Sequence, residues 1–131
     1  MFVDASAMTA ILLSETDAED LLERLEGAQT RRTSAIAIFE TVRALMRAAE
    51  IEPDEARSWV DGFMAAERIE LVHVGPEAGK LALEAMARFG KGRHPAQLNM
   101  GDCFAYACAR RLDAPLLYKG DDFIKTDIRT S

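Results

Sequence analysis

The sequence predicts an α/β domain whose sheet is short, mostly parallel and made of four to five strands. Short apolar runs rich in β-branched residues alternate with longer segments of helical period, which is typical of strands joined by crossover helices. The 131 residues contain no internal repeat and no linker-like stretch, and 49% of them are hydrophobic. We therefore expect one domain spanning residues 1–131 around a well-filled interior.

The first half of the chain is expected to hold two strands and four helices. Helix boundaries follow from local signals, because Thr16 or Asp17 can cap a helix, Gly27 can end it, and Pro53 favours the first turn of another. In chain order we expect a strand at 2–3, a helix from 5 or 6 to 12, a helix from 16 or 17 to 27, a strand at 31–34, and helices beginning at 35 and 53.

The second half should add strands and two more helices. Gly75 and Pro76 separate a strand from a helix, and Asn99 followed three residues later by Asp102 has the spacing of a capping pair. The helix ending at Gly90 presents Leu81, Leu83, Met86 and Phe89. We expect a strand at 69–74, a helix at 77–90, a loop at 91–97, a helix from 99, a strand at 115–118 that ends in the turn sequence GDDF, and a short last strand beginning at Ile128.

Cysteine usage and the N-terminus both indicate a soluble, cytoplasmic protein. Cys103 and Cys108 lie five residues apart in an expected helix, so their side chains point apart and we predict unpaired core residues. The sequence begins MFVDASAM, without the basic and apolar regions of an export signal, and no run of about 20 apolar residues occurs. We therefore expect no membrane partner.

The formal net charge of -6 argues at first against a nucleic-acid partner, because phosphate binding normally needs a basic surface. Two arrangements would remove the objection. Acidic side chains could bind cations that reverse the local charge, or the few basic residues could cluster at the binding site.

Acidic residues stand where a parallel sheet places ligands, at the carboxyl ends of its strands. Asp4 follows the first strand, and Asp121 with Asp122 follows the strand at 115–118. Asp102 lies at a helix N-terminus, which tolerates an anion, and Glu40 comes from the first half of another helix. Each has an ordinary alternative role as a cap, a turn residue or an exposed acid.

If these carboxylates meet, their mutual repulsion must be compensated. Neighbouring like charges at about 4 Å repel by roughly 1 to 4 kcal/mol per pair. Hard cations such as Mg²⁺ or Mn²⁺ prefer oxygen ligands and share them with substrate phosphates. A bound cation lowers the pKa of a water and neutralises phosphate charge, so the pattern indicates phosphodiester hydrolysis by metal-activated water.

Longer motifs strengthen this hypothesis because their order resembles that of PIN-domain ribonucleases. The motifs are VDASA at residues 3–7, TSAIAIFE at 33–40, GKGRHPAQLNMGDCFAYA at 90–107 and LLYKGDDF at 116–123. More narrowly, they are similar to the VapC toxins of bacterial type II toxin-antitoxin pairs. The resemblance covers nearly the whole chain, and the third motif followed by GDDF is its most specific part.

The resemblance implies a three-layer α/β/α fold and a defined acidic site. It implies that Asp4, Glu40, Asp102 and Asp122 are the catalytic, Mg²⁺-binding quartet, with Asp4 and Asp102 as the principal ligands. Asp121 takes an accessory place, since related proteins often carry Asn there, and Ser6 would contribute a hydroxyl. It also implies an RNA substrate, a homodimer and a cognate antitoxin.

The basic and apolar residues offer several candidate surfaces for RNA and for an antitoxin, and the sequence does not decide between them. Lys91, Arg93 and His94 are candidate RNA-backbone contacts, although a solvated basic loop would have the same composition. Two other pairs compete for that role, namely Arg31 with Arg32 and Lys119 with Lys125. An apolar set could line a groove for an antitoxin helix, but we favour a core role for it; its members are Met46, Trp59, Phe63 and Met64.

Two other classes of protein fit part of the pattern. A receiver-type signalling domain is also acidic, doubly wound and Mg²⁺-binding, but it needs a phosphoacceptor Asp after its middle strand. Here the strand at 69–74 is followed by Gly75 and Pro76. A non-catalytic PIN-like interaction module is the second alternative, and the intact acidic set argues against it.

Overall fold

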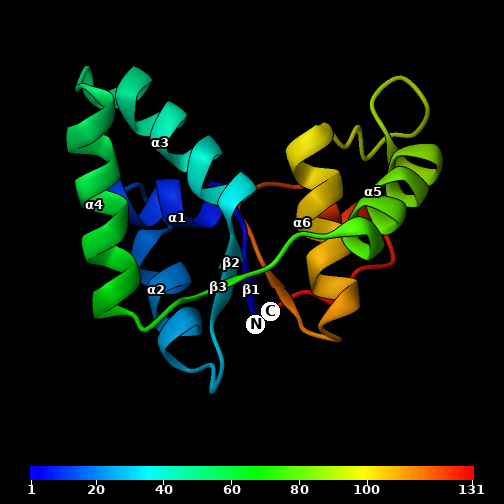
Figure 1. Ribbon diagram of the computed structural model, residues 1–131, viewed down its shortest axis with the longest axis horizontal. Helices are drawn as coiled ribbons and strands as arrows, with labels where there is room; N and C mark the ends of the chain where they lie inside the picture. Colours follow the sequence, from blue (N-terminus) through cyan, green and yellow to red (C-terminus); the bar gives the residue numbers. More distant parts are fainter.

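The computed structural model describes residues 1–131 and has a four-stranded parallel sheet at its centre, in the order β3-β2-β1-β4 (Figure 1). The strands are β1 (Phe2–Val3), β2 (Arg32–Ser34), β3 (Glu70–Val72) and β4 (Leu116–Leu117). All pairs are parallel, with Phe2 opposite both Arg32 and Leu116. The predicted parallel sheet is confirmed at four strands.

A fifth strand beginning at Ile128 is not formed, and that prediction was wrong. The chain there makes only an isolated bridge between Leu116 and Thr130. The Leu116 N–H donates to the Arg129 carbonyl at 2.9 Å, and the Leu116 carbonyl accepts the N–H of Ser131 at 3.0 Å. The C-terminal residues therefore cover the edge of β4 without continuing as a strand.

Six α-helices connect and cover the strands, as the capping and stop signals predicted. They are α1 (Ala5–Leu12), α2 (Ala18–Glu26), α3 (Ala35–Ala49), α4 (Pro53–Ala66), α5 (Pro76–Phe89) and α6 (Met100–Arg111), and a 3₁₀ turn, η1, spans Phe123–Lys125. The hydroxyl of Ser34 caps α3 by accepting the N–H of Ala37 at 3.1 Å. Pro53 and Pro76 occupy the first turns of α4 and α5.

Side-chain alternation along the short strands creates the three layers. Phe2 and Leu116 point to one side of the sheet, where they pack with α5 and α6, whereas Val3 and Leu117 point to the other side and pack with α1 and α2. Figure 1 shows α1 to α4 on one side of the sheet and α5 with α6 on the other. The predicted α/β/α architecture is confirmed.

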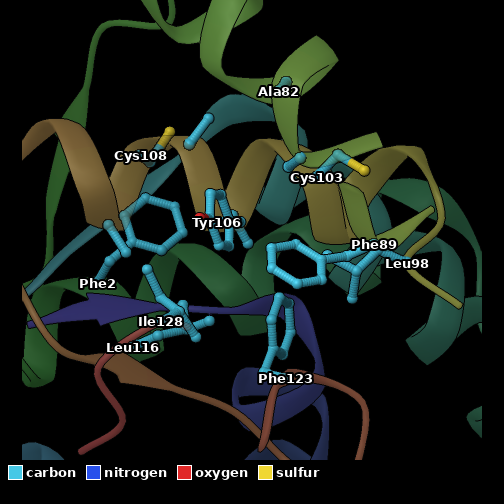
Figure 2. Close-up of a cluster of buried hydrophobic side chains, with 14 of the residues drawn as sticks. Phe2, Ala82, Phe89, Leu98, Cys103, Tyr106, Cys108, Leu116, Phe123 and Ile128 are labelled. Atoms are coloured by element: carbon cyan, nitrogen blue, oxygen red, sulfur yellow. The ribbon is translucent and has the colours of Figure 1, made fainter. Parts of the chain in front are cut away.

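Aromatic and aliphatic side chains fill the layer between the sheet and α6. Figure 2 shows the rings of Phe2, Tyr106, Phe89 and Phe123 gathered below that helix. Cys103 and Cys108 lie at separate points along α6, buried and unpaired, as predicted. A smaller cluster of Leu45, Ala56 and Val60 holds α3 against α4.

Two of the apolar residues noted on α5 lie outside the core. Leu83 and Met86 are 62% and 49% exposed, because the helix packs on α6 through small side chains and Phe89 instead. Of the candidate groove residues, Met46, Phe63 and Met64 pack against core clusters, whereas Trp59 is exposed. No helix is both long and apolar enough to cross a membrane.

Candidate active site

Asp4 lies between β1 and α1 as the N-cap of the helix, and it is only 3% exposed. Its carboxylate accepts the backbone N–H of Ser6 at 3.0 Å and the Ser6 hydroxyl at 2.5 Å. The same hydroxyl accepts the backbone N–H of Lys119 at 3.0 Å. Ser6 therefore connects Asp4 to the chain that leaves β4, and two strand ends are held together at one edge of the sheet.

Burial raises the pKa of Asp4, although the two hydrogen bonds from Ser6 act in the opposite direction. The structural role considered for Asp4 is also real, since it is the N-cap of α1. A cap exposed to water would have the same hydrogen bonds without this burial. The carboxylate is therefore in a position to do more than cap a helix.

Asp102 is fixed in the first turn of α6 by a capping box. The Asn99 side chain accepts the Asp102 N–H at 2.9 Å, and the Asp102 carboxylate accepts the Asn99 N–H at 3.0 Å. This confirms the predicted pairing. Burial, followed by the charges of Asp4 and Asp122, raises the pKa of Asp102 to about 6, while its bond from Asn99 acts to lower it.

Glu40 lies on α3 and lines the same cavity as Asp4 and Asp102. The buried side chains of Ala37 and Thr41 fix the rotation of α3 about its axis. Burial first, and then the charges of Asp4 and Asp102, raise its pKa to about 7, against a lowering influence of Arg43. Because the charge of Asp4 acts on both Glu40 and Asp102, the three carboxylates share one electrostatic environment.

These three carboxylates line one cavity of about 420 Å³, as the sequence predicted for them. They come from the end of β1, the first half of α3 and the start of α6. The polar lining is completed by Ser6, Thr9, Glu15, Asn99 and Lys119. We refer below to this cavity as the acidic pocket.

Asp121 and Asp122 lie outside the lining of the acidic pocket. Both are exposed in the turn between β4 and η1, where Gly120 adopts a φ of 104°. The charge of Asp122 still contributes to raising the pKa of Asp102. Three residues of the predicted quartet therefore line the pocket, and the fourth, Asp122, acts on it only through its charge. No three acidic, histidine or cysteine side chains converge tightly enough to hold a metal ion as they stand.

The chemistry of the lining nevertheless suits a hard divalent cation. All the candidate donors are carboxylate or hydroxyl oxygens, and the carboxylates oppose one another's ionisation, which a nearby positive charge would relieve. Lys119 does not provide that charge freely, since its ammonium group pairs with Glu15 and, at 3.3 Å, with Asp17. Asp4 and Asp102 are the buried and half-buried candidates to hold a cation.

The basic residues proposed for RNA are in varied environments. Lys91 and Arg93 are exposed in the loop before α6, and Lys91 lines an apolar groove beside Met100. The His94 ring accepts the N–H of Ala96 at 3.0 Å and packs edge-on against Phe89, so it has a structural role in the loop. Their RNA role stays a prediction.

The competing basic pairs are partly engaged. Arg31 donates to the carbonyls of Ala28, Glu26 and Glu67 and to the Glu67 carboxylate, which fixes it in the fold. Lys119 is engaged through Glu15 and Asp17, as described above. Neither residue is free to make an unhindered phosphate contact.

Two features of the site were missed by sequence reasoning. Glu15 lines the acidic pocket from the loop after α1, although nothing in its local sequence distinguishes it from other exposed acids. Gly101 lies directly against the carboxylate of Glu40, a long-range contact between α3 and α6. Its position immediately before Asp102 is the only local signal that could have drawn attention to it.

Comparison with known proteins shows which family the chain belongs to. The family model of the PIN domain matches residues 1–129, and the chain belongs to that family. It is 43% identical to a VapC ribonuclease of Rhizobium meliloti, over 97% of this chain and 98% of that protein. It is 38% identical to ribonuclease VapC30 of Mycobacterium tuberculosis, over 99% and 97% of the two chains. The family predicted from the motifs is thus confirmed.

A solved structure supports the fold independently of sequence. The crystal structure of Mycobacterium tuberculosis VapC20, described as a sarcin-ricin loop cleaving toxin, matches with a TM-score of 0.77 at 17% identity and covers 99% of this chain and 97% of that one. The match confirms the PIN fold, and family membership removes the receiver domain as an alternative.

Proposed function

We propose that this protein is a Mg²⁺-dependent endoribonuclease, with Mn²⁺ able to substitute, and the toxin of a type II toxin-antitoxin pair. The observation that carries the proposal is the acidic pocket, in which Asp4, Glu40 and Asp102 meet from three distant segments. The similarity to VapC ribonucleases over nearly the whole chain supports the same activity. A purely structural set of acids would not need to share one cavity.

Each acidic residue has a place in the proposed reaction. Asp4 and Asp102 would hold the cation, with Asp122 contributing at the approach to the pocket. Bound Mg²⁺ supplies a lowered pKa for water and charge neutralisation at the phosphodiester. Ser6 keeps the Asp4 carboxylate in one orientation through a 2.5 Å hydrogen bond. Glu40 adds a third carboxylate beside Asp4 and Asp102; its pKa is about 7 in the metal-free protein, and a cation bound beside it would lower that value.

The partners follow from the same proposal. RNA is the substrate, and a cognate antitoxin protein and a second copy of the chain are the protein partners, in the cytoplasm. Large exposed apolar side chains support burial against another protein; they include Phe39, Leu71, Leu83, Met86 and Met100. Size measurement of the purified chain, alone and after co-expression with a candidate antitoxin, tests both protein partners.

The activity is tested with the purified chain and a mixed RNA substrate. We expect cleavage with Mg²⁺, none with a chelator, and loss of cleavage in Asp4→Asn and Asp102→Asn, which retain an oxygen able to accept the capping bonds. Circular dichroism should show that both variants stay folded. Full activity in either variant would overturn the site assignment, and absence of cleavage by the wild type would favour the non-catalytic alternative.

The RNA target requires a separate experiment. We expect the ends of cellular RNA, sequenced after induced expression, to accumulate at a defined set of positions. The matched control is expression of Asp4→Asn, which should show none of these ends. Identical ends in the two samples would mean that another nuclease made them.

A further inference from the structure

The carboxylate of Glu40 occupies the space that a side chain at position 101 would need. A Cβ placed on Gly101 would lie 1.9 Å from Oε2, 2.4 Å from Oε1 and 2.3 Å from Cδ of Glu40. These separations are far inside van der Waals contact. Gly101 is buried in the first turn of α6. At this contact α6 therefore presents only backbone atoms to the Glu40 side chain of α3.

Glycine at this position is unfavourable for the helix itself. Glycine lowers helix stability relative to alanine, and Gly101 has ordinary helical geometry without a positive φ. The helix therefore does not need a glycine for its own conformation. The other two glycines within helices, Gly62 and Gly79, have nothing within 4 Å of a Cβ, so among these three the close approach is specific to Gly101.

The atoms that a Cβ would meet determine what the substitution would change. All three nearest atoms belong to the end of the flexible Glu40 side chain, and none belongs to backbone. A methyl group at 101 can therefore be accommodated by rotation of Glu40, which would leave the fold in place. The displaced group would be the carboxylate that now lies within electrostatic reach of Asp4 and Asp102.

We propose that Gly101 is a positioning residue of the acidic pocket, whose missing side chain lets the Glu40 carboxylate join Asp4 and Asp102. The inference rests on the proposed nuclease function for its catalytic consequence, but not for the contact itself. Gly101 acts through Glu40 and touches no substrate. Its effect should therefore disappear when the Glu40 carboxylate is absent.

The test is a double-mutant cycle of Gly101→Ala and Glu40→Ala, with Gly62→Ala as the matched control. Displacing a reacting group by about 1 Å costs roughly a hundredfold in rate, so we expect Gly101→Ala to lose about that factor in kcat, with the KM for RNA unchanged. The double variant should be no less active than Glu40→Ala alone. Gly62→Ala should keep full activity, since a Cβ there meets nothing within 4 Å.

Melting temperatures of the four metal-free proteins provide a readout that does not depend on catalysis. Gly101→Ala should raise the melting temperature more in the Glu40→Ala background than in the wild type, because only the wild type has the clash. If Gly101→Ala fails to fold and the double variant folds, the contact is supported. Wild-type kcat in Gly101→Ala, equal temperature changes in both backgrounds, or failure of both variants to fold would overturn the proposal. Inactivity of the wild type would refute the proposed function, while the melting temperatures would still decide the contact.

Discussion

Replacing Glu40 by glutamine removes one negative charge from the acidic pocket and keeps the length of the side chain. The substitution tests whether the carboxylates of the pocket oppose one another in the metal-free protein. No hydrogen bond from Glu40 is lost, because none is made to its carboxylate in the structure. A change in stability then reports the charge rather than a broken contact.

The magnitude follows from the pKa of the group. The rise from 4.5 to about 7 in the pKa of Glu40 corresponds to an upper limit of about 3 kcal/mol against the ionised side chain. Since part of the side chain keeps contact with solvent, we expect about 1 to 2 kcal/mol in practice. That gain should raise the melting temperature of the metal-free protein by about 3 to 8 °C.

The sign of the pH dependence of stability is determined by whether the folded or the unfolded protein binds the Glu40 proton more tightly. The folded protein binds the Glu40 proton up to a pH of about 7, whereas the unfolded chain releases it near 4.5. The stability contribution is therefore complete below pH 4.5 and is lost as the pH rises to about 7. The raised pKa values of Asp4 and Asp102 act in the same direction.

Urea unfolding of both metal-free proteins across this pH range measures the difference directly. We expect Glu40→Gln to be more stable than the wild type at pH values above 7 and nearly equal below 4.5. Glu84→Gln, an exposed acid on α5, controls for the general effect of reducing the net charge. A Glu40→Gln protein that is less stable above pH 7, or whose gain is independent of pH, would refute the reasoning.

Three smaller predictions concern groups that hold the site or the core. Ser6→Ala should lower the cleavage rate by about tenfold or more, because Asp4 loses its 2.5 Å bond from the hydroxyl; a rate equal to that of the wild type would contradict this. Asn99→Ala should cost about 1 kcal/mol in urea unfolding by removing the α6 cap. Tyr106→Phe should cost about 1 to 2 kcal/mol by removing the hydroxyl that donates to Asp127, with cleavage unchanged because Tyr106 does not line the acidic pocket.

The part of the site that lies on strand ends and helix caps could be predicted from the sequence. Asp4 follows an apolar run, and Asp102 stands three residues after a capping asparagine, so short-range signals place both. Parallel pairing then brings strand ends to one edge, which is a general property of such sheets. The sequence could place Glu40 on a helix, but only the resemblance to PIN-domain ribonucleases assigned it to the same site as Asp4 and Asp102.

Contacts that depend on how helices cross could not be predicted in this way. The approach of Glu40 to Gly101 is set by the packing of α3 against α6, which no local pattern encodes. On α5 the apolar pattern did not indicate that small residues form the buried face. The sequence therefore did not predict that Leu83 and Met86 would be exposed. The position of Asp122 outside the pocket lining depends on the turn after β4.

Binding of Mn²⁺ to the metal-free protein, followed by electron paramagnetic resonance, tests the central claim most directly. If the acidic pocket holds a divalent cation, the wild type should bind Mn²⁺ saturably and Mg²⁺ should compete for the same site. Asp4→Asn retains an oxygen able to accept the Ser6 N–H and removes one buried carboxylate charge, so it should lose that binding. Equal Mn²⁺ binding by the wild type and Asp4→Asn would contradict the account.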